Sequence, residues 1–135
     1  MHPARKFASL AVFLLVPCLG AGCGDDDEGT GISQAQQRGV GAACSRDEDC
    51  TEPGQVCLAF KGGYCGVADC TADAQCPAGS ACVTHDDQRN YCFLICTDKV
   101  QCNQTRPADI ESNCSSSITF VDDNPEFKAC VPPSS

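Results

Sequence analysis

The sequence contains few of the side chains from which a hydrophobic core is built. Its 135 residues include no tryptophan and a single methionine, and only 6% of them are aromatic. A small domain with so few large apolar residues is only marginally stable if it relies on burial alone. The chain therefore needs another source of stability.

Positive charge is also scarce. The chain has 9 Lys and Arg against 18 Asp and Glu, for a net charge of −9. Two of the basic residues, Arg5 and Lys6, lie in an N-terminal segment with the pattern of an export signal, and its removal leaves 7 − 18 = −11. Such a charge disfavours binding to nucleic acid or to bare anionic lipid, and it leaves a cationic partner or divalent cations open.

Long hydrophobic runs are absent apart from one short run at residues 7–17. It follows the basic residues Arg5 and Lys6 and precedes a stretch of small residues, which is the order typical of a secretory signal. The run is shorter than the roughly 20 apolar residues that a membrane-spanning helix needs. Residues 1–22 are therefore predicted to be a signal peptide.

The segment Leu19-Gly20-Ala21-Gly22-Cys23 resembles the lipobox of bacterial lipoproteins, with Gly20 at a position where that family usually has leucine. The resemblance implies that Cys23 is lipidated and becomes the mature N-terminus. It places the chain in the bacterial cell envelope, at the outer membrane or cell surface in preference to the inner membrane, held by palmitate-type acyl chains. Ordinary cleavage without lipid is the alternative.

Cysteine is what the sequence has in abundance. Fourteen cysteines in 135 residues is the density of an exported disulfide scaffold. If Cys18 leaves with the signal and Cys23 carries lipid, 14 − 2 = 12 cysteines remain, an even number that can pair completely. Residues 23–40, the lipidated terminus and an acidic, Gln-rich stretch, lack an apolar period and are predicted to be a disordered tether.

The remaining cysteines fall into three sets of four, which indicates an internal repeat. In each set five residues separate the first cysteine from the second. The first set is Cys44, Cys50, Cys57 and Cys65, the second is Cys70, Cys76, Cys82 and Cys92, and the third is Cys96, Cys102, Cys114 and Cys130. The sequence thus predicts a small disulfide-rich fold of three tandem modules, at 41–68, 69–94 and 95–135, with short β-hairpins and little or no helix.

Each module is predicted to form a hairpin between its third and fourth cysteines. The first hairpin pairs 56–60 with 64–65, the second pairs 82–84 with 91–93, and the third pairs 118–121 with 127–131. The apolar run at 93–95 is predicted to fill the contact between the second and third modules, and an exposed binding patch is the alternative.

Sequence alone leaves the disulfide connectivity open, because four cysteines allow three pairings. Third and fourth cysteines that stand opposite each other in one hairpin fit disulfide geometry poorly, so they are expected to reach outward. The favoured pairing joins first to third and second to fourth in each module. It predicts the pairs Cys44 with Cys57, Cys50 with Cys65, Cys70 with Cys82, Cys76 with Cys92, Cys96 with Cys114, and Cys102 with Cys130.

The spacing of the first module, with Asp47 and Asp49 between Cys44 and Cys50 and with Gly54 three residues before Cys57, resembles the cysteine-rich modules of Dickkopf-type proteins. The resemblance covers residues 41–102 and extends loosely to the third module. It implies an extracellular interaction module with the pairing given above. It transfers no catalytic residue and no partner.

Patterns for catalysis or metal binding are weak. His85, the one histidine after the signal, lies beside Asp86 and Asp87 and is predicted to sit in a solvated turn. The chain has no Cys-x-x-Cys pair of the kind that structural zinc sites favour. The acidic segments 47–49 and 122–124 lack the EF-hand spacing and are predicted to be solvated turns, with weak calcium binding as the alternative.

These features together predict a non-catalytic interaction module that needs no cofactor, no metal and no small-molecule substrate. Its partner would be a protein or a glycan. The exposed hairpin turns 86–90 and 122–126 are the expected binding surface, through Asp86, Asp87, Arg89, Asp122 and Asp123. A small disulfide-rich protease inhibitor and a weak calcium-binding surface protein are the alternatives.

Overall fold

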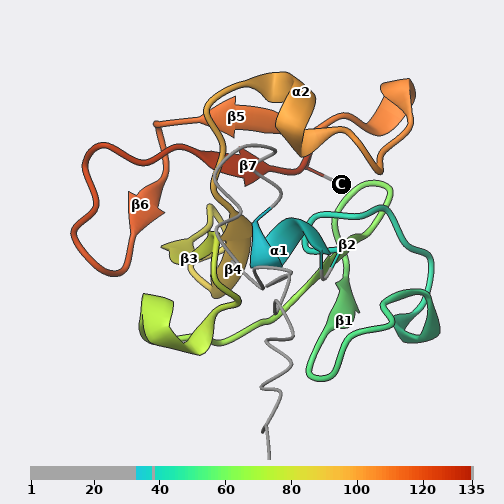
Figure 1. Ribbon diagram of the computed structural model, residues 1–135, viewed down its shortest axis with the longest axis horizontal. Helices are drawn as coiled ribbons and strands as arrows, with labels where there is room; N and C mark the ends of the chain where they lie inside the picture. Colours follow the sequence, from blue (N-terminus) through green and yellow to red (C-terminus); the bar gives the residue numbers. More distant parts are fainter. Residues whose placement is uncertain (1–32, 38, 135) are drawn as a thin grey trace, which may run out of the picture.

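The computed structural model describes residues 33–37 and 39–134, so the predicted signal peptide and Cys23 lie outside the described residues (Figure 1). Within these residues the regular structure is two short helices, three single 3₁₀ turns and seven short strands. The helices are α1 (Gln34–Gln37) and α2 (Lys99–Cys102), and the turns are η1 (Asp47–Asp49), η2 (Asp73–Gln75) and η3 (Ala108–Ile110). The strands are β1 (Val56–Leu58), β2 (Tyr64–Gly66), β3 (Ser80–Thr84), β4 (Asn90–Leu94), β5 (Asn113–Ser115), β6 (Thr119–Phe120) and β7 (Ala129–Val131). This is the small disulfide-rich fold that the sequence predicts.

Each module contains a two-stranded antiparallel pair in which the third and fourth cysteines stand directly opposite each other. The opposed pairs are Cys57 with Cys65, Cys82 with Cys92, and Cys114 with Cys130. In the first two modules the pair is β1 with β2 and β3 with β4, at the predicted places. The repeat in the sequence is therefore a repeat in the backbone.

The predicted third hairpin is wrong in its partner strand. Strand β7 pairs with β5, whereas β6 leaves the module and pairs with β3 of the second module, in the order β4-β3-β6. Figure 1 shows β6 set apart from the β5–β7 pair. The alternation at 118–121 indicated a strand but not its neighbour. Cys114 and Cys130 stand opposite each other in β5 and β7, so the strand pair inside the third module is β5 with β7. Strand β6 pairs instead with the free edge of β3.

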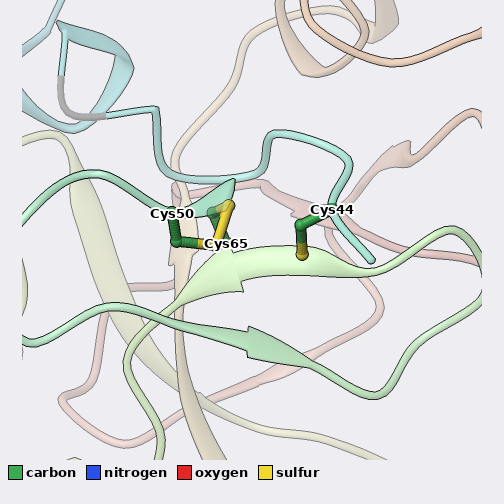
Figure 2. Close-up of side chains that lie close together, drawn as sticks. All are labelled: Cys44, Cys50 and Cys65. Atoms are coloured by element: carbon green, nitrogen blue, oxygen red, sulfur yellow. A yellow bond between two sulfur atoms is a disulfide. The ribbon is translucent and has the colours of Figure 1, made fainter. Parts of the chain in front are cut away.

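The six disulfides join first to third and second to fourth cysteines in every module, which is the favoured pairing given above. Their Cα–Cα distances lie between 5.3 and 5.9 Å. The two bridges of a module lie against each other, because the sulfurs of its first, second and fourth cysteines are all within 4.8 Å of one another. Figure 2 shows this for Cys44, Cys50 and Cys65. At about 2 to 4 kcal/mol per bridge, these crosslinks rival burial as a source of stability.

The constant five-residue spacing between the first two cysteines has a hydrogen-bonding cause. The residue before the second cysteine accepts a bond from the backbone N–H just after the first cysteine, at 2.6–2.8 Å: Asp49 from Ser45, Gln75 from Thr71, and Gln101 from Thr97. A side chain that closes the loop in this way substitutes for a missing backbone partner. An Asp or Gln at this position is therefore part of the repeat.

A second side-chain hydrogen bond, to the backbone N–H of the third cysteine, occurs in the first two modules only. Asp47 accepts a bond from the N–H of Cys57 at 2.9 Å, and Asp73 accepts one from the N–H of Cys82 at 2.8 Å. The equivalent residue of the third module is Lys99, which forms an ion pair with Glu111 at 2.5 Å. In the third module an ion pair thus replaces this hydrogen bond in holding the loop between the first two cysteines.

The main hydrophobic cluster lies where the three modules meet. Rings of the first two modules pack in it or against it, namely Phe60, Tyr64, His85, Tyr91 and Phe93, with centroids 5.0 Å apart for both Phe60–His85 and Tyr64–Phe93. Phe93 is fully buried and the adjacent leucine of β4 is 3% exposed. Phe93 packs on Tyr64 of the first module, and Ile95 forms an isolated β-bridge with Ala129 of the third. The run at 93–95 thus contacts the first module as well as the predicted third, and the alternative of an exposed patch is wrong.

Arg106 connects the third module to the first. Its guanidinium is buried and donates to four backbone carbonyls, those of Gly41, Gly63, Lys61 and Ile110, at 2.8–3.1 Å. Burial lowers the pKa of Arg106, and the ring of Tyr64 lies 5.8 Å from the guanidinium carbon. Arg106 belongs to residues 103–113, a segment between the second and third cysteines that is longer than its equivalents at 51–56 and 77–81 and that we call the insertion. The insertion is thereby fixed onto the first hairpin.

The disordered tether was predicted to run to residue 40, and its described part, 33–37 and 39–40, contradicts this. Ala35 is fully buried and Val40 is 3% exposed, both within the main cluster. The backbone N–H of Ala35 donates to the carbonyl of Ala78 at 2.7 Å. Two small apolar residues give no periodic pattern in a sequence, but they fill a gap between modules.

Candidate functional site

A row of three linked hollows runs past the tip of the β3–β4 hairpin. The central hollow, of about 470 Å³, is lined by the hairpin tip, by β5 and by residues 117–119. One neighbour, of about 320 Å³, contains Phe60 and shares His85 and Asp86 with the central hollow. The other, of about 230 Å³, contains Phe127 and shares Ile118 and Thr119 with it. We call these three hollows the tip groove.

The hairpin tip is held rigidly by short-range hydrogen bonds. The N–H of His85 donates to the carbonyl of Arg89 and the N–H of Gln88 donates to the carbonyl of His85, both at 2.9 Å. Gln88 has φ = 64°, a left-handed conformation that closes the turn. Asp87 accepts bonds from the N–H of Arg89 at 3.0 Å and from the hydroxyl of Tyr91 at 2.6 Å. The turn therefore presents a fixed surface.

The bond between Asp87 and Tyr91 sets the charge state of the tip. The Tyr91 hydroxyl and the Arg89 N–H hold the pKa of Asp87 below its usual value. Burial, together with the bond to Asp87, raises the pKa of Tyr91 to about 12. At neutral pH the carboxylate is thus ionised and the phenol is a donor.

Two of the five predicted binding residues lie in this part of the groove. Asp86 is exposed and lines both the central and the Phe60 hollow, and Asp87 lines the Phe60 hollow. Arg89 points elsewhere, since its guanidinium donates to both carboxylate oxygens of Asp69 at 3.1 and 3.2 Å, which raises the pKa of Arg89. Arg89 therefore supports the turn and does not line the groove.

In the acidic turn 122–126, too, one predicted binding residue lines the groove and the other does not. Asp123 lines the Phe127 hollow at the far end of the tip groove. Asp122 does not line it, because its carboxylate accepts the N–H of Asp73 at 2.8 Å and so supports the start of η2. The structure thus brings Asp86, Asp87 and Asp123 to one groove and gives Arg89 and Asp122 roles in holding loops.

The predicted solvated position of His85 is wrong. Its side chain is only 8% exposed and packs edge-on against Phe60 and Phe93. The Nδ1 atom is buried without a hydrogen bond, 3.9 Å from a carboxylate oxygen of Asp87. Side chains two residues apart lie on the same face of a strand, and Val83 of β3 is buried. The apolar Val83, two residues before His85, was therefore the sequence signal that could have predicted an inward position for His85.

The acidic segment 47–49 is engaged in the first module's own loop. Asp47 bonds the N–H of Cys57, and the backbone N–H groups of Ser45 and Arg46 lower the pKa of Asp49. In the described part of the chain, every close group of three metal-ligand side chains consists of cysteines that are all in disulfides. A sulfur in a disulfide is not a thiolate and does not serve as a metal ligand.

Comparison of the chain with protein-family models, with curated proteins and with solved structures gives no match. None of the helices in residues 33–37 and 39–134 has the length and apolar character that a membrane crossing requires. The cysteine framework, the N-terminal motif and the tip groove are the features of this chain that bear on its function.

Proposed function

We propose that this chain is a lipid-anchored, non-catalytic binding module of the bacterial cell envelope. The observation that carries the proposal is that the twelve cysteines of the described part all pair, in six disulfides. Disulfide-dense small domains form and persist in oxidising compartments and are rare in the cytosol. The framework therefore supports export.

The anchor is proposed at Cys23, which lies outside the described residues. Its support is the lipobox-like run that ends at Cys23 and the signal pattern before it. A diacylglyceryl group supplies two acyl chains, and two chains anchor a protein stably where one does not. Residues 24–32 would then connect the anchor to the part that begins with α1.

Binding is proposed in place of catalysis because the tip groove is preformed and is lined mainly by neutral polar groups. A rigid, crosslinked surface loses little conformational entropy when a partner binds. His85 is the one histidine in residues 33–37 and 39–134, and its Nδ1 is buried beside Asp87 within a ring cluster. The groove therefore favours recognition.

The test is the intact mass of the protein extracted from its native membrane without reductant, together with a count of free thiols. We expect a chain that begins at Cys23, carries acyl chains and has no free thiol. The variant Cys23→Ala should lose the acyl mass. The matched variant Cys18→Ala should give the same mature mass as the parent chain, because Cys18 leaves with the signal.

A mature chain with no acyl group would contradict the anchor. Free thiols in the unreduced protein would contradict the disulfide framework, and with it the argument for export.

A further inference from the structure

The three hollows of the tip groove form an elongated site. Each outer hollow shares two lining residues with the central one: His85 and Asp86 on one side, Ile118 and Thr119 on the other. The central hollow, at about 470 Å³, and the Phe60 hollow, at about 320 Å³, each fall within the range of about 300–1,000 Å³ typical of ligand sites. A row of this kind suits a chain-like ligand whose units repeat.

The central hollow offers neutral hydrogen-bonding groups. Six hydroxyl and amide side chains line it: Thr84, Gln88, Asn113, Ser115, Ser117 and Thr119. Hydroxyl and amide groups both donate and accept, as sugar hydroxyls do, so each can pair with a sugar in more than one orientation. Asp86 is the single carboxylate in this hollow and adds a strong acceptor.

Aromatic rings lie at both ends of the row. Phe60 is half-buried and lines one outer hollow, whereas Phe120 and Phe127 line the other, with their rings edge to face at 6.1 Å. Phe127 is 36% exposed, which is unusual for a large apolar side chain in this fold. The apolar faces of sugar rings pack on such aromatic surfaces and bury them from water.

Charge restricts the ligand further. Among the described residues, no Lys or Arg lines any of the three hollows, while Asp86, Asp87 and Asp123 are spread along them. An anionic ligand would be repelled at each position. A fully apolar ligand would leave the hydroxyls and amides of the central hollow without partners.

We propose that the tip groove binds a neutral oligosaccharide, with hydroxyl and amide side chains holding its central units and phenylalanine rings packing on the units at the ends. This inference depends on the proposed binding function and gives it a ligand class. The walls are held by β3–β6 pairing and by disulfides at Cys82 and Cys114, so the site needs little rearrangement.

The test is calorimetric titration of the purified mature protein with neutral sugar chains. The probes are cellohexaose, maltohexaose and N-acetylchitohexaose, with cellobiose, maltose and N-acetylchitobiose as short counterparts and hexagalacturonate as the anionic control. We expect at least one neutral hexasaccharide to bind, its disaccharide to bind at least about tenfold more weakly, and hexagalacturonate not to bind. A loss of about tenfold corresponds to one net hydrogen bond or ring contact.

Matched variants locate the site. Asn113→Ala in the central hollow and Phe127→Ala at one end should each raise Kd by about tenfold. Gln104→Ala and Val100→Ala change exposed residues outside the tip groove and should leave Kd unchanged. The disulfide-intact mass of every variant checks that it has folded.

Three results would overturn the inference: no binding of any neutral hexasaccharide, equal binding of hexagalacturonate, or equal losses in the groove and control variants. Binding of a basic peptide alone would assign the groove to a protein partner. These failures differ from failure of the proposed function, because the intact mass of the same sample reports separately on the acyl anchor and the free thiols.

Discussion

The third module differs from the first two, and the differences join it to both of them. In the first and second modules a tyrosine, Tyr64 or Tyr91, precedes the fourth cysteine, and a short hairpin follows the third. The third module has Ala129 at that position and a long insertion. That insertion supplies Arg106 to the first module, and β6 extends the sheet of the second. The first two copies pack on each other through their rings, and the divergent third copy adds contacts of its own to both.

The largest expected effect comes from removing a disulfide of the third module. The bridge between Cys102 and Cys130 spans 28 residues, against 12 for the bridge between Cys70 and Cys82. Because a longer loop loses more entropy on closure, the double substitution Cys102→Ala with Cys130→Ala should cost about 3.5 kcal/mol. Replacing the pair at 70 and 82 should cost about 3 kcal/mol. Urea unfolding of both variants measures the difference.

If removing the bridge between Cys70 and Cys82 lowered the free energy of unfolding more than removing the bridge between Cys102 and Cys130, the expected difference between the two modules would be contradicted.

Replacing Arg106 should have the next largest effect. The variant Arg106→Leu leaves four backbone carbonyls without a charged donor, two of them, those of Gly41 and Gly63, in buried hydrogen bonds, and we expect a loss of about 3 kcal/mol in the free energy of unfolding. Urea unfolding with the disulfides intact is the measurement. The matched control is Arg46→Leu, since the side chain of Arg46 is 74% exposed and its removal should hardly move the urea midpoint. Equal midpoints for the two variants would show that the insertion does not connect the modules.

Removing the carboxylate that accepts the N–H of the third cysteine should cost more stability in the second module than in the first. Asp73 accepts the N–H of Cys82 and the side-chain amide of Asn124, which belongs to the third module, whereas Asp47 accepts only the N–H of Cys57. We expect Asp73→Ala to cost about 2 kcal/mol and Asp47→Ala about 1 kcal/mol. Thermal unfolding at neutral pH compares the two, and a reversed order would mean that the contact from the third module adds nothing.

The smallest effect concerns the two tyrosines, the only ones in the chain. Burial raises the pKa of Tyr64 beyond the usual range, and burial with the Asp87 bond raises that of Tyr91 to about 12. An unfolded tyrosine ionises near pH 10, so the stability each phenol gives is complete below about pH 10 and is lost as pH rises further. Tyrosinate absorbance of the folded protein should therefore stay low at pH 10 and rise first for Tyr91. In Tyr91→Phe that first rise should vanish, and an unchanged curve would contradict the assignment.

Much of the fold follows from the cysteines alone. Equal spacing between first and second cysteines predicted three modules, and the turn residues between third and fourth cysteines predicted the first two hairpins. The third hairpin could not be predicted, because residues 118–121 pair equally well with any free strand edge. Only the tertiary arrangement offers β3 as that edge.

The site was less predictable. Asp86, Asp87 and Asp123 stood out as charged residues in turns, and they line the groove. The hydroxyl and amide side chains of the central hollow come from separated segments, so no motif marks them. Arg106 gave no signal either, because its four acceptors are backbone carbonyls, which every residue has.

The most direct test of this account is a disulfide map of the protein from its native membrane, by proteolysis and mass spectrometry without reductant. We expect six linked peptide pairs, among them Cys96 with Cys114 and Cys102 with Cys130, and an N-terminal peptide that begins with acylated Cys23. A peptide linking Cys114 to Cys130, or Cys23 in a disulfide with another cysteine, would contradict it.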